Sequence, residues 1–108
     1  MALIVTDHDL SSGATTSTEV ATPNNWRVTA TVTGSNFLQF VTCYLEVEDT
    51  PGNWSPLKDN LGKTIQMMLR GNETKSINAL VVNGANGRVQ VVPNTDHDGT
   101  INVDSINA

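Results

Sequence analysis

The sequence predicts an all-β fold, a single antiparallel β-sandwich or small barrel of about seven strands with an N-terminal arm. Fourteen Thr and twelve Val stand against four Glu and three Lys, a composition that favours strands over helices. Several segments alternate apolar and polar residues, and turn-forming residues separate them at intervals of roughly eight to twelve residues. The 108 residues suffice for one compact domain with its own core.

The clearest predicted strand covers residues 26–33. Apolar residues from Trp26 to Val32 alternate there with Arg27 and three Thr, so one face of the strand is apolar and the other polar. The remaining strands are predicted at 3–6, 37–48, 64–70, 74–82, 88–92 and 100–106.

Turn chemistry separates these strands. Pro51-Gly52 predicts a chain reversal, since Pro presets φ at the first corner and Gly tolerates positive φ at the second. Two Asn-Gly steps within residues 83–87 predict a hairpin or a tight loop.

The N-terminal segment differs from the rest of the chain. Residues 11–25 are rich in Ser and Thr and contain little to bury. We therefore expect residues 1–25 to form a short strand and an arm, and residues 26–108 to form the sandwich domain.

Charge and hydropathy argue against two classes of partner. Six Lys and Arg against eleven Asp and Glu give a net charge of −5, so nucleic acid is not an expected partner. No segment is long and apolar enough to span a membrane, and the early apolar run at 2–5 is too short for a secretory signal. Folding in the cytoplasm is expected, and the only cysteine, Cys43, excludes an intramolecular disulfide.

No catalytic site and no cofactor are predicted, so the chain is not expected to be an enzyme. Cys43 alternates with Val41 and Leu45, which is typical of a buried, inert thiol. Glu46 and Glu48 could form a carboxylate pair for glycoside chemistry, but their period-two spacing is more typical of solvated residues or an interface rim.

The tetrapeptide Thr-Asp-His-Asp occurs twice, at 6–9 and 95–98. One interpretation is a metal site in which His8, His97 and the neighbouring carboxylates are ligands. The other is a pair of solvated loops at strand ends, because Asp residues before Gly are ordinary turn formers. We favour the second and assign no metal site.

Six side chains are predicted to contact a partner. Phe40 and Tyr44 lie on the outer face of the 37–48 strand, and Trp54 follows the turn, where its ring can anchor an interface, stack on a sugar, or plug the end of the sandwich. Unpaired sheet edges and the arm favour self-association. The predicted contact residues are Leu3, Ile4, Val5, Phe40, Tyr44 and Trp54.

Five features occur in a fixed order along the chain. They are an alternating Thr/Val strand at 28–32, a Gly-x-Phe-like turn at 34–37, a Val-x-Leu-x strand at 43–47, an Asp-x-x-Gly-x-Trp turn at 49–54 and an Arg-Val-x-Val strand at 88–92. This order resembles the small all-β accessory proteins of tailed-bacteriophage virions, such as head decoration or cement-like proteins.

The resemblance implies a non-enzymatic virion structural protein that binds the outside of an assembled capsid. On this interpretation the protein is a symmetric homo-oligomer, a trimer, whose partner is the major capsid protein or another virion protein, with the arm serving as an added strand or clamp. The competing prediction is a carbohydrate- or receptor-binding β-sandwich in which Trp54, Tyr44 and the Asn-rich loops form the recognition surface.

Overall fold

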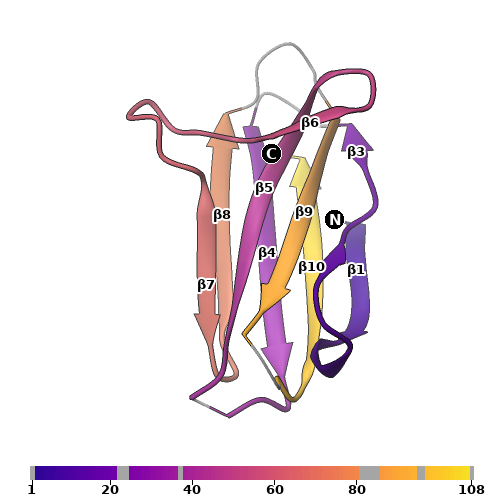
Figure 1. Cartoon of the computed structure of the whole chain (residues 1–108), viewed down its shortest axis with the longest axis vertical. Helices are drawn as coiled ribbons and strands as arrows, with labels where there is room; N and C mark the ends of the chain where they lie inside the picture. Colours follow the sequence, from indigo (N-terminus) through magenta and orange to yellow (C-terminus); the bar gives the residue numbers. More distant parts are fainter. Residues whose placement is uncertain (1, 22–24, 37, 81–85, 95–96, 108) are drawn as a thin grey trace.

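The computed structural model describes residues 2–21, 25–36, 38–80, 86–94 and 97–107. Two antiparallel β-sheets pack face to face as a sandwich and do not close into a barrel (Figure 1). One sheet has the strand order β1-β10-β4-β8; the other has the order β2-β9-β5-β6, with β3 paired to β9 and β7 to β5. The elements are β1 (Ala2–Asp9), the 3-10 helix η1 (Leu10–Ser12), β2 (Thr15–Thr16), β3 (Val20–Ala21), β4 (Asn25–Thr33), β5 (Phe40–Thr50), β6 (Asn53–Pro56), β7 (Gln66–Arg70), β8 (Thr74–Leu80), β9 (Asn86–Pro93) and β10 (Thr100–Asn107).

The central strands are β4, between β10 and β8, and β5, between β9 and the pair β6 and β7. Along one edge of β5, β7 pairs with the first half of the strand and β6 with the second half. The chain between β6 and β7 leaves the sheet beside Leu45. There Leu57 N donates to Leu45 O at 2.8 Å and Leu45 N donates to Ile65 O at 3.2 Å.

The core lies between the sheets and follows the predicted alternation. Val41, Cys43 and Leu45 of β5 point inward and are fully buried, and Trp26 on β4 is equally inaccessible. Burial of such side chains, worth roughly 25 cal/mol per Å² of apolar surface, is the main force that holds the two sheets together. Other buried apolar residues are Ile4, Val5, Leu10, Val28, Ala30, Val32, Met67, Leu69, Ala79, Val89, Val91, Ile101 and Val103.

The predicted class is confirmed, but the number of strands is larger than predicted. Each of the seven predicted segments overlaps an observed strand. The described residues contain ten strands because β2, β3 and β6 are present as well, with two, two and four residues. Strands this short contain too few alternating positions to be recognised by periodicity.

The predicted N-terminal arm is wrong. β1 pairs with β10 along an edge of the four-stranded sheet, Leu10 is buried, and the chain then crosses to the other sheet, where β2 and β3 pair with β9. Ser17 N donates to Val89 O at 2.9 Å, and Val89 N donates back to Ser17 Oγ at 2.8 Å. Ser and Thr residues of the 11–25 segment form several of the hydrogen bonds that attach it to the sandwich. Because the same residue types are common in linkers, the composition of this segment predicted an arm.

The predicted chain reversal at Pro51-Gly52 is confirmed, because β5 and β6 form an antiparallel pair and Gly52 has φ +82°. The 83–87 segment does not join two paired strands, since β8 and β9 belong to different sheets. Residues 83–85 of that segment lie outside the described residues. No helix among the described residues is long and apolar enough to cross a membrane.

Candidate binding face

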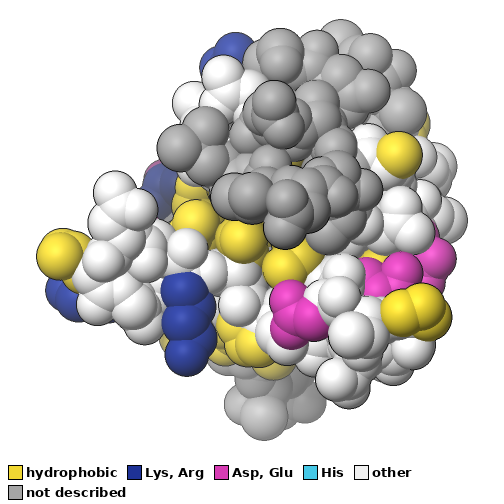
Figure 2. All heavy atoms as spheres, turned by 90° about the horizontal axis from the view of Figure 1, so that it is seen from above, with side chains coloured by type: hydrophobic (Ala, Val, Ile, Leu, Met, Phe, Trp, Pro, Cys, Tyr) yellow, Lys and Arg dark blue, Asp and Glu magenta, His cyan; other side chains and the backbone are white. Residues whose placement is uncertain are grey.

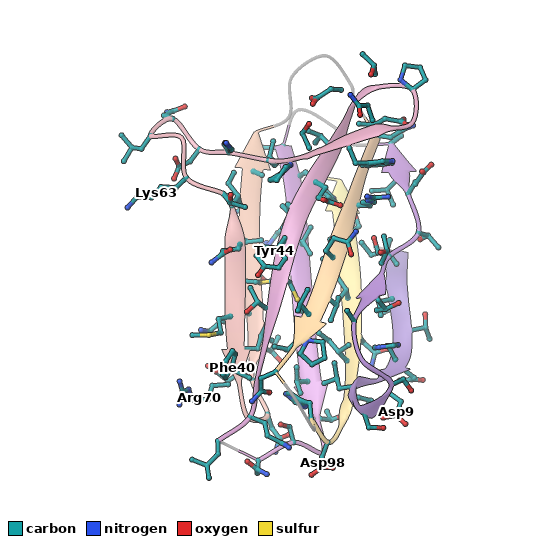
Figure 3. The ribbon with its side chains drawn as sticks, in the orientation of Figure 1. Asp9, Phe40, Tyr44, Lys63, Arg70 and Asp98 are labelled. Atoms are coloured by element: carbon teal, nitrogen blue, oxygen red, sulfur yellow. The ribbon has the colours of Figure 1, made fainter. Side chains whose placement is uncertain are left out.

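The outer surface of the six-stranded sheet carries three of the six predicted contact residues, and we call it the β5 face. Because Val41, Cys43 and Leu45 point inward, the alternate residues of β5 point outward, as Figure 3 shows for Phe40 and Tyr44. Residues opposite them in register share this face. The β5 face comprises Phe40, Thr42, Tyr44, Glu46 and Glu48 of β5, Trp54 and Pro56 of β6, Gln66, Met68 and Arg70 of β7, Arg88, Gln90 and Val92 of β9, and Thr16 of β2.

One end of the β5 face is apolar. Met68 and Val92 flank Thr42 on its two sides and are both exposed, Met68 by 45 %. Phe40 lies one row away, and its backbone N–H donates to Asn94 Oδ1 at 3.1 Å. A methionine, a valine and a phenylalanine thus form a patch that no described element covers.

The middle of the β5 face is polar but uncharged. Tyr44 pairs with Gln66 of β7 on one side and with Gln90 of β9 on the other. Thr16 Oγ1 donates to Gln90 Oε1 at 2.8 Å, and Gln90 Nε2 donates to Glu46 Oε1 at 3.1 Å. These hydrogen bonds fix the amide of Gln90, the residue of β9 that pairs with Tyr44.

At the other end of the β5 face, the Trp54 ring lies next to an ion pair between Arg88 and Glu46. Arg88 Nε donates to Glu46 Oε1 at 2.7 Å, and Arg88 Cζ lies 4.3 Å from the centroid of the Trp54 ring. The guanidinium therefore contacts a carboxylate and an indole at once, an arrangement that suits its planar shape. Trp54 is half-buried, so it neither enters the core nor stands free in solvent.

The two glutamates are committed to structural contacts. Glu46 accepts from Arg88 and Gln90, whereas Glu48 accepts from Gly52 N at 2.8 Å and from Asn86 Nδ2 at 3.3 Å. A carboxylate pair for glycoside hydrolysis needs one group free to donate a proton and one free to attack or to activate water. Glu46 accepts both of its bonds at Oε1 and Glu48 accepts one at each oxygen, so both carboxylates take part in contacts that hold the sheet and the adjoining turn.

The three predicted contact residues of β1 are separated by the fold. Leu3 is exposed by 52 %, whereas Ile4 and Val5 are buried in the core. Only Leu3 is therefore available to a partner, and it lies on the other sheet, away from the β5 face. The structure brings together Phe40, Tyr44 and Trp54 but not the β1 residues.

The outer surface of the four-stranded sheet has a different chemistry. Hydroxyl groups pair across its strands, with Thr29 Oγ1 and Ser76 Oγ 2.7 Å apart, and Thr33 Oγ1 and Thr100 Oγ1 3.1 Å apart. No aromatic side chain of a described residue lies among them. Among the described Phe, Tyr and Trp residues, those outside the core thus lie on one side of the sandwich.

The two Thr-Asp-His-Asp segments approach the same end of the sandwich, where Asp9 pairs with Thr100 and Leu10 N donates to Gly99 O at 3.0 Å. His8 lies in β1 with its Nε2 2.8 Å from Gly13 O, and His97 is buried with Nδ1 donating to Asp98 O. The prediction of two solvated loops is therefore wrong in part: residues 6–9 belong to a strand, although Thr6, Asp7 and Asp9 are exposed as expected, and His97 is buried. Among described residues no group of three or more His, Cys, Asp or Glu side chains could hold a metal ion; Asp96 lies outside them.

Cys43 has the environment of a core residue. It is fully buried, and desolvation raises the pKa of its thiol to about 12. A nucleophilic cysteine needs a lowered pKa and access to substrate. Cys43 has neither, so it is a packing residue, as predicted.

Sequence reasoning did not place Met68, Val92, Arg88 or Gln90 on the β5 face. Their alternation with buried residues is visible in the sequence, but their approach to Tyr44 and Trp54 depends on which strands pair with β5.

No family model, no curated protein and no solved structure matches the chain.

Proposed function

We propose that the chain is a non-enzymatic structural protein that decorates an assembled virion shell, docking through the β5 face and working as a symmetric homo-oligomer. The observation that carries this proposal is the β5 face itself. Phe40, Tyr44, Trp54, Met68 and Val92 lie on one sheet surface that no described element covers.

The chemistry of the β5 face suits protein docking. Tyr, Trp, Met and Arg are enriched in protein interfaces, and Tyr, Trp and Arg are enriched among the residues that contribute most of the binding free energy. The backbone of β5 is held by hydrogen bonds on both sides, so little backbone freedom is lost when a partner covers this face. The amide groups in the polar middle of the face can form directional hydrogen bonds with a partner.

Docking of this kind would stabilise the shell by mass action. A protein that binds the assembled shell but not its free subunits shifts the equilibrium toward the assembled form, by about 2.7 kcal/mol when its concentration is about one hundred times Kd. No chemical step is required, which agrees with the structural roles of Cys43, Glu46 and Glu48.

Co-sedimentation with mature tailed-phage heads tests the proposal. Met68→Glu places a carboxylate in the apolar end of the β5 face, and we expect it to weaken binding by at least about tenfold because that charge would be desolvated. Asn78→Glu is the matched control on β8 of the other sheet, and we expect it to bind like wild type. Unchanged binding by Met68→Glu, or equal loss in both variants, would contradict docking through this face.

A second candidate is supported by the setting of Tyr44. An aromatic ring flanked by the amides of Gln66 and Gln90 offers a stacking surface and hydrogen-bonding groups, which is what a sugar ring requires. Glycan-array binding that is lost in Gln90→Ala but retained in Met68→Glu would favour a carbohydrate-binding module over shell docking.

A further inference from the structure

The chain between β6 and β7 projects from the sandwich, and we call residues 58–64 the finger. Figure 1 shows this connection extending away from both sheets at the upper left, and Figure 2 shows the same segment standing clear of the body with an apolar side chain near its tip. A Cβ placed on Gly62 would meet no atom within 4 Å. The tip of the finger is therefore surrounded by open space.

The finger is held in shape by its own hydrogen bonds. Gly62 N donates to Asp59 O at 3.0 Å to close a turn, and Asp59 N donates to Lys63 O at 2.9 Å. Asp59 Oδ1 also accepts from Leu61 N and Lys63 N, at 2.9 and 3.0 Å. At its base Ile65 N donates to Leu57 O at 2.7 Å, so the finger is a pre-organised hairpin.

The finger presents an apolar side chain between two cations. Leu61 is exposed by 83 %, the largest value among the exposed large hydrophobic residues that the structure describes. Lys58 and Lys63 flank it and make no ion pair with a described residue. Two of the three lysines of an acidic chain thus lie within three residues of Leu61.

The opposite side of the sandwich has the complementary chemistry, and we call it the acidic side: Leu3, Asp7, Asp9 and Asp104. Leu3 of β1 pairs with Asp104 of β10 on the outer surface of the four-stranded sheet. Residues 2–21 and 100–107 contain no Lys or Arg. Figure 3 shows Lys63 and Asp9 on opposite sides of the molecule.

We propose that the finger of one copy docks on the acidic side of a second copy, with Leu61 against Leu3 and with Lys58 and Lys63 facing the carboxylates. This inference rests on the proposed homo-oligomer and names its interface. Exposed leucines on both surfaces provide apolar contact, and opposite charges set the orientation.

The position of the two surfaces determines the kind of symmetry. Because the finger and the acidic side are different surfaces on opposite sides of one molecule, the contact is heterologous, head to tail. Repetition of such a contact gives a closed ring or an open chain of copies, and a two-fold dimer cannot satisfy it. The flanking charges are exposed, so association should weaken as salt is raised.

Two monomer-forming variants test the inference by light scattering coupled to gel filtration. The finger variant carries Leu61→Ser, Lys58→Glu and Lys63→Glu; the acceptor variant carries Leu3→Ser and Asp104→Lys. All five positions are at least partly exposed, so circular dichroism should show an unchanged β-fold. We expect wild type to form a multiple of 11.6 kDa and each variant alone to be a monomer.

Mixing the two variants gives the decisive result. One intact finger and one intact acceptor remain, so we expect a 1:1 dimer of twice 11.6 kDa that cannot grow further. The control is Leu38→Ser, which removes a leucine exposed by 70 % in the loop between β4 and β5 and should keep the wild-type mass.

Three results would overturn the inference: a monomeric wild type, variants that keep the wild-type mass, or a mixture that remains monomeric. Loss of association in Leu38→Ser would also count against it, because general apolar adhesion would then explain the oligomer. Shell docking through the β5 face is measured separately with Met68→Glu, so either proposal can fail while the other stands.

Discussion

The guanidinium of Arg88 lies over the indole ring of Trp54, with Arg88 Cζ 4.3 Å from the ring centroid. The same guanidinium donates to Glu46 from Nε. Arg88 is on β9, Glu46 on β5 and Trp54 on β6, so this single side chain ties together three strands of the six-stranded sheet.

Replacing Arg88 should destabilise the fold and loosen Trp54. Arg88→Met keeps much of the side-chain volume but removes the charged hydrogen bond to a half-buried carboxylate, so we expect the free energy of unfolding to fall by about 1–2 kcal/mol. Urea unfolding measures this change. Arg88→Lys should recover only part of the loss, because an ammonium lacks the planar fork; full recovery, or no loss in Arg88→Met, would contradict the role given to the guanidinium.

A side-chain hydrogen bond joins β4 and β10 in the core, and we expect its two residues to be energetically coupled. Trp26 Nε1 donates to Ser105 Oγ at 2.8 Å where both residues are buried. Ser105→Ala leaves the indole N–H without this partner and should cost about 1–3 kcal/mol. In a double-mutant cycle with Trp26→Phe the two losses should not add, and strict additivity would show that the bond contributes nothing.

Asp9 makes part of the stability dependent on pH. The hydroxyl and the backbone N–H of Ser11 both donate to its carboxylate and hold the pKa of Asp9 below its ordinary value of 3.8. Because the folded pKa is the lower one, ionised Asp9 stabilises the fold above the ordinary value, and this contribution is lost as pH falls through the lowered value.

Asp9→Asn removes the titrating group and keeps an acceptor oxygen. The advantage of wild type over this variant in urea unfolding should be present at neutral pH and should disappear as the pH is taken well below 3.8. An advantage that is the same at every pH would mean that the charge of Asp9 does not matter to the fold.

Cys43 should react with thiol reagents only when the protein unfolds. Burial raises the pKa of its thiol to about 12, so the reactive thiolate is absent from the native protein at neutral pH. We expect the rate of modification by a thiol-specific disulfide reagent to follow the unfolded fraction as urea is raised. Fast modification of the native protein would place Cys43 near the surface and reopen a chemical role for it.

The long strands were predictable because they alternate strictly. In β4 and β5 every second residue is apolar over most of the strand, and these residues form the centre of the core. The segment at 11–25 was misread because β2 and β3 attach through the backbone and through Ser17, with few apolar side chains to mark them. Composition alone does not separate such a segment from a linker.

The candidate site was predictable only in part for a related reason. The period of β5 places Phe40 and Tyr44 on its outer face whatever the fold. The neighbours of Tyr44, and the position of Trp54 over Arg88, depend on pairing between strands far apart in sequence. The finger was also missed, because the exposure of Leu61 follows from β6 and β7 sharing one edge of β5.

Hydroxyl-radical footprinting on shell-bound protein tests the central claim most directly. Met68 is exposed and reactive, whereas its neighbour Met67 is buried and serves as an internal reference. We predict that binding to heads slows the oxidation of Met68, Tyr44 and Trp54 and leaves His8 in β1 unchanged. Oxidation of Met68 at the same rate with and without heads, in a sample shown to be bound, would contradict docking through the β5 face.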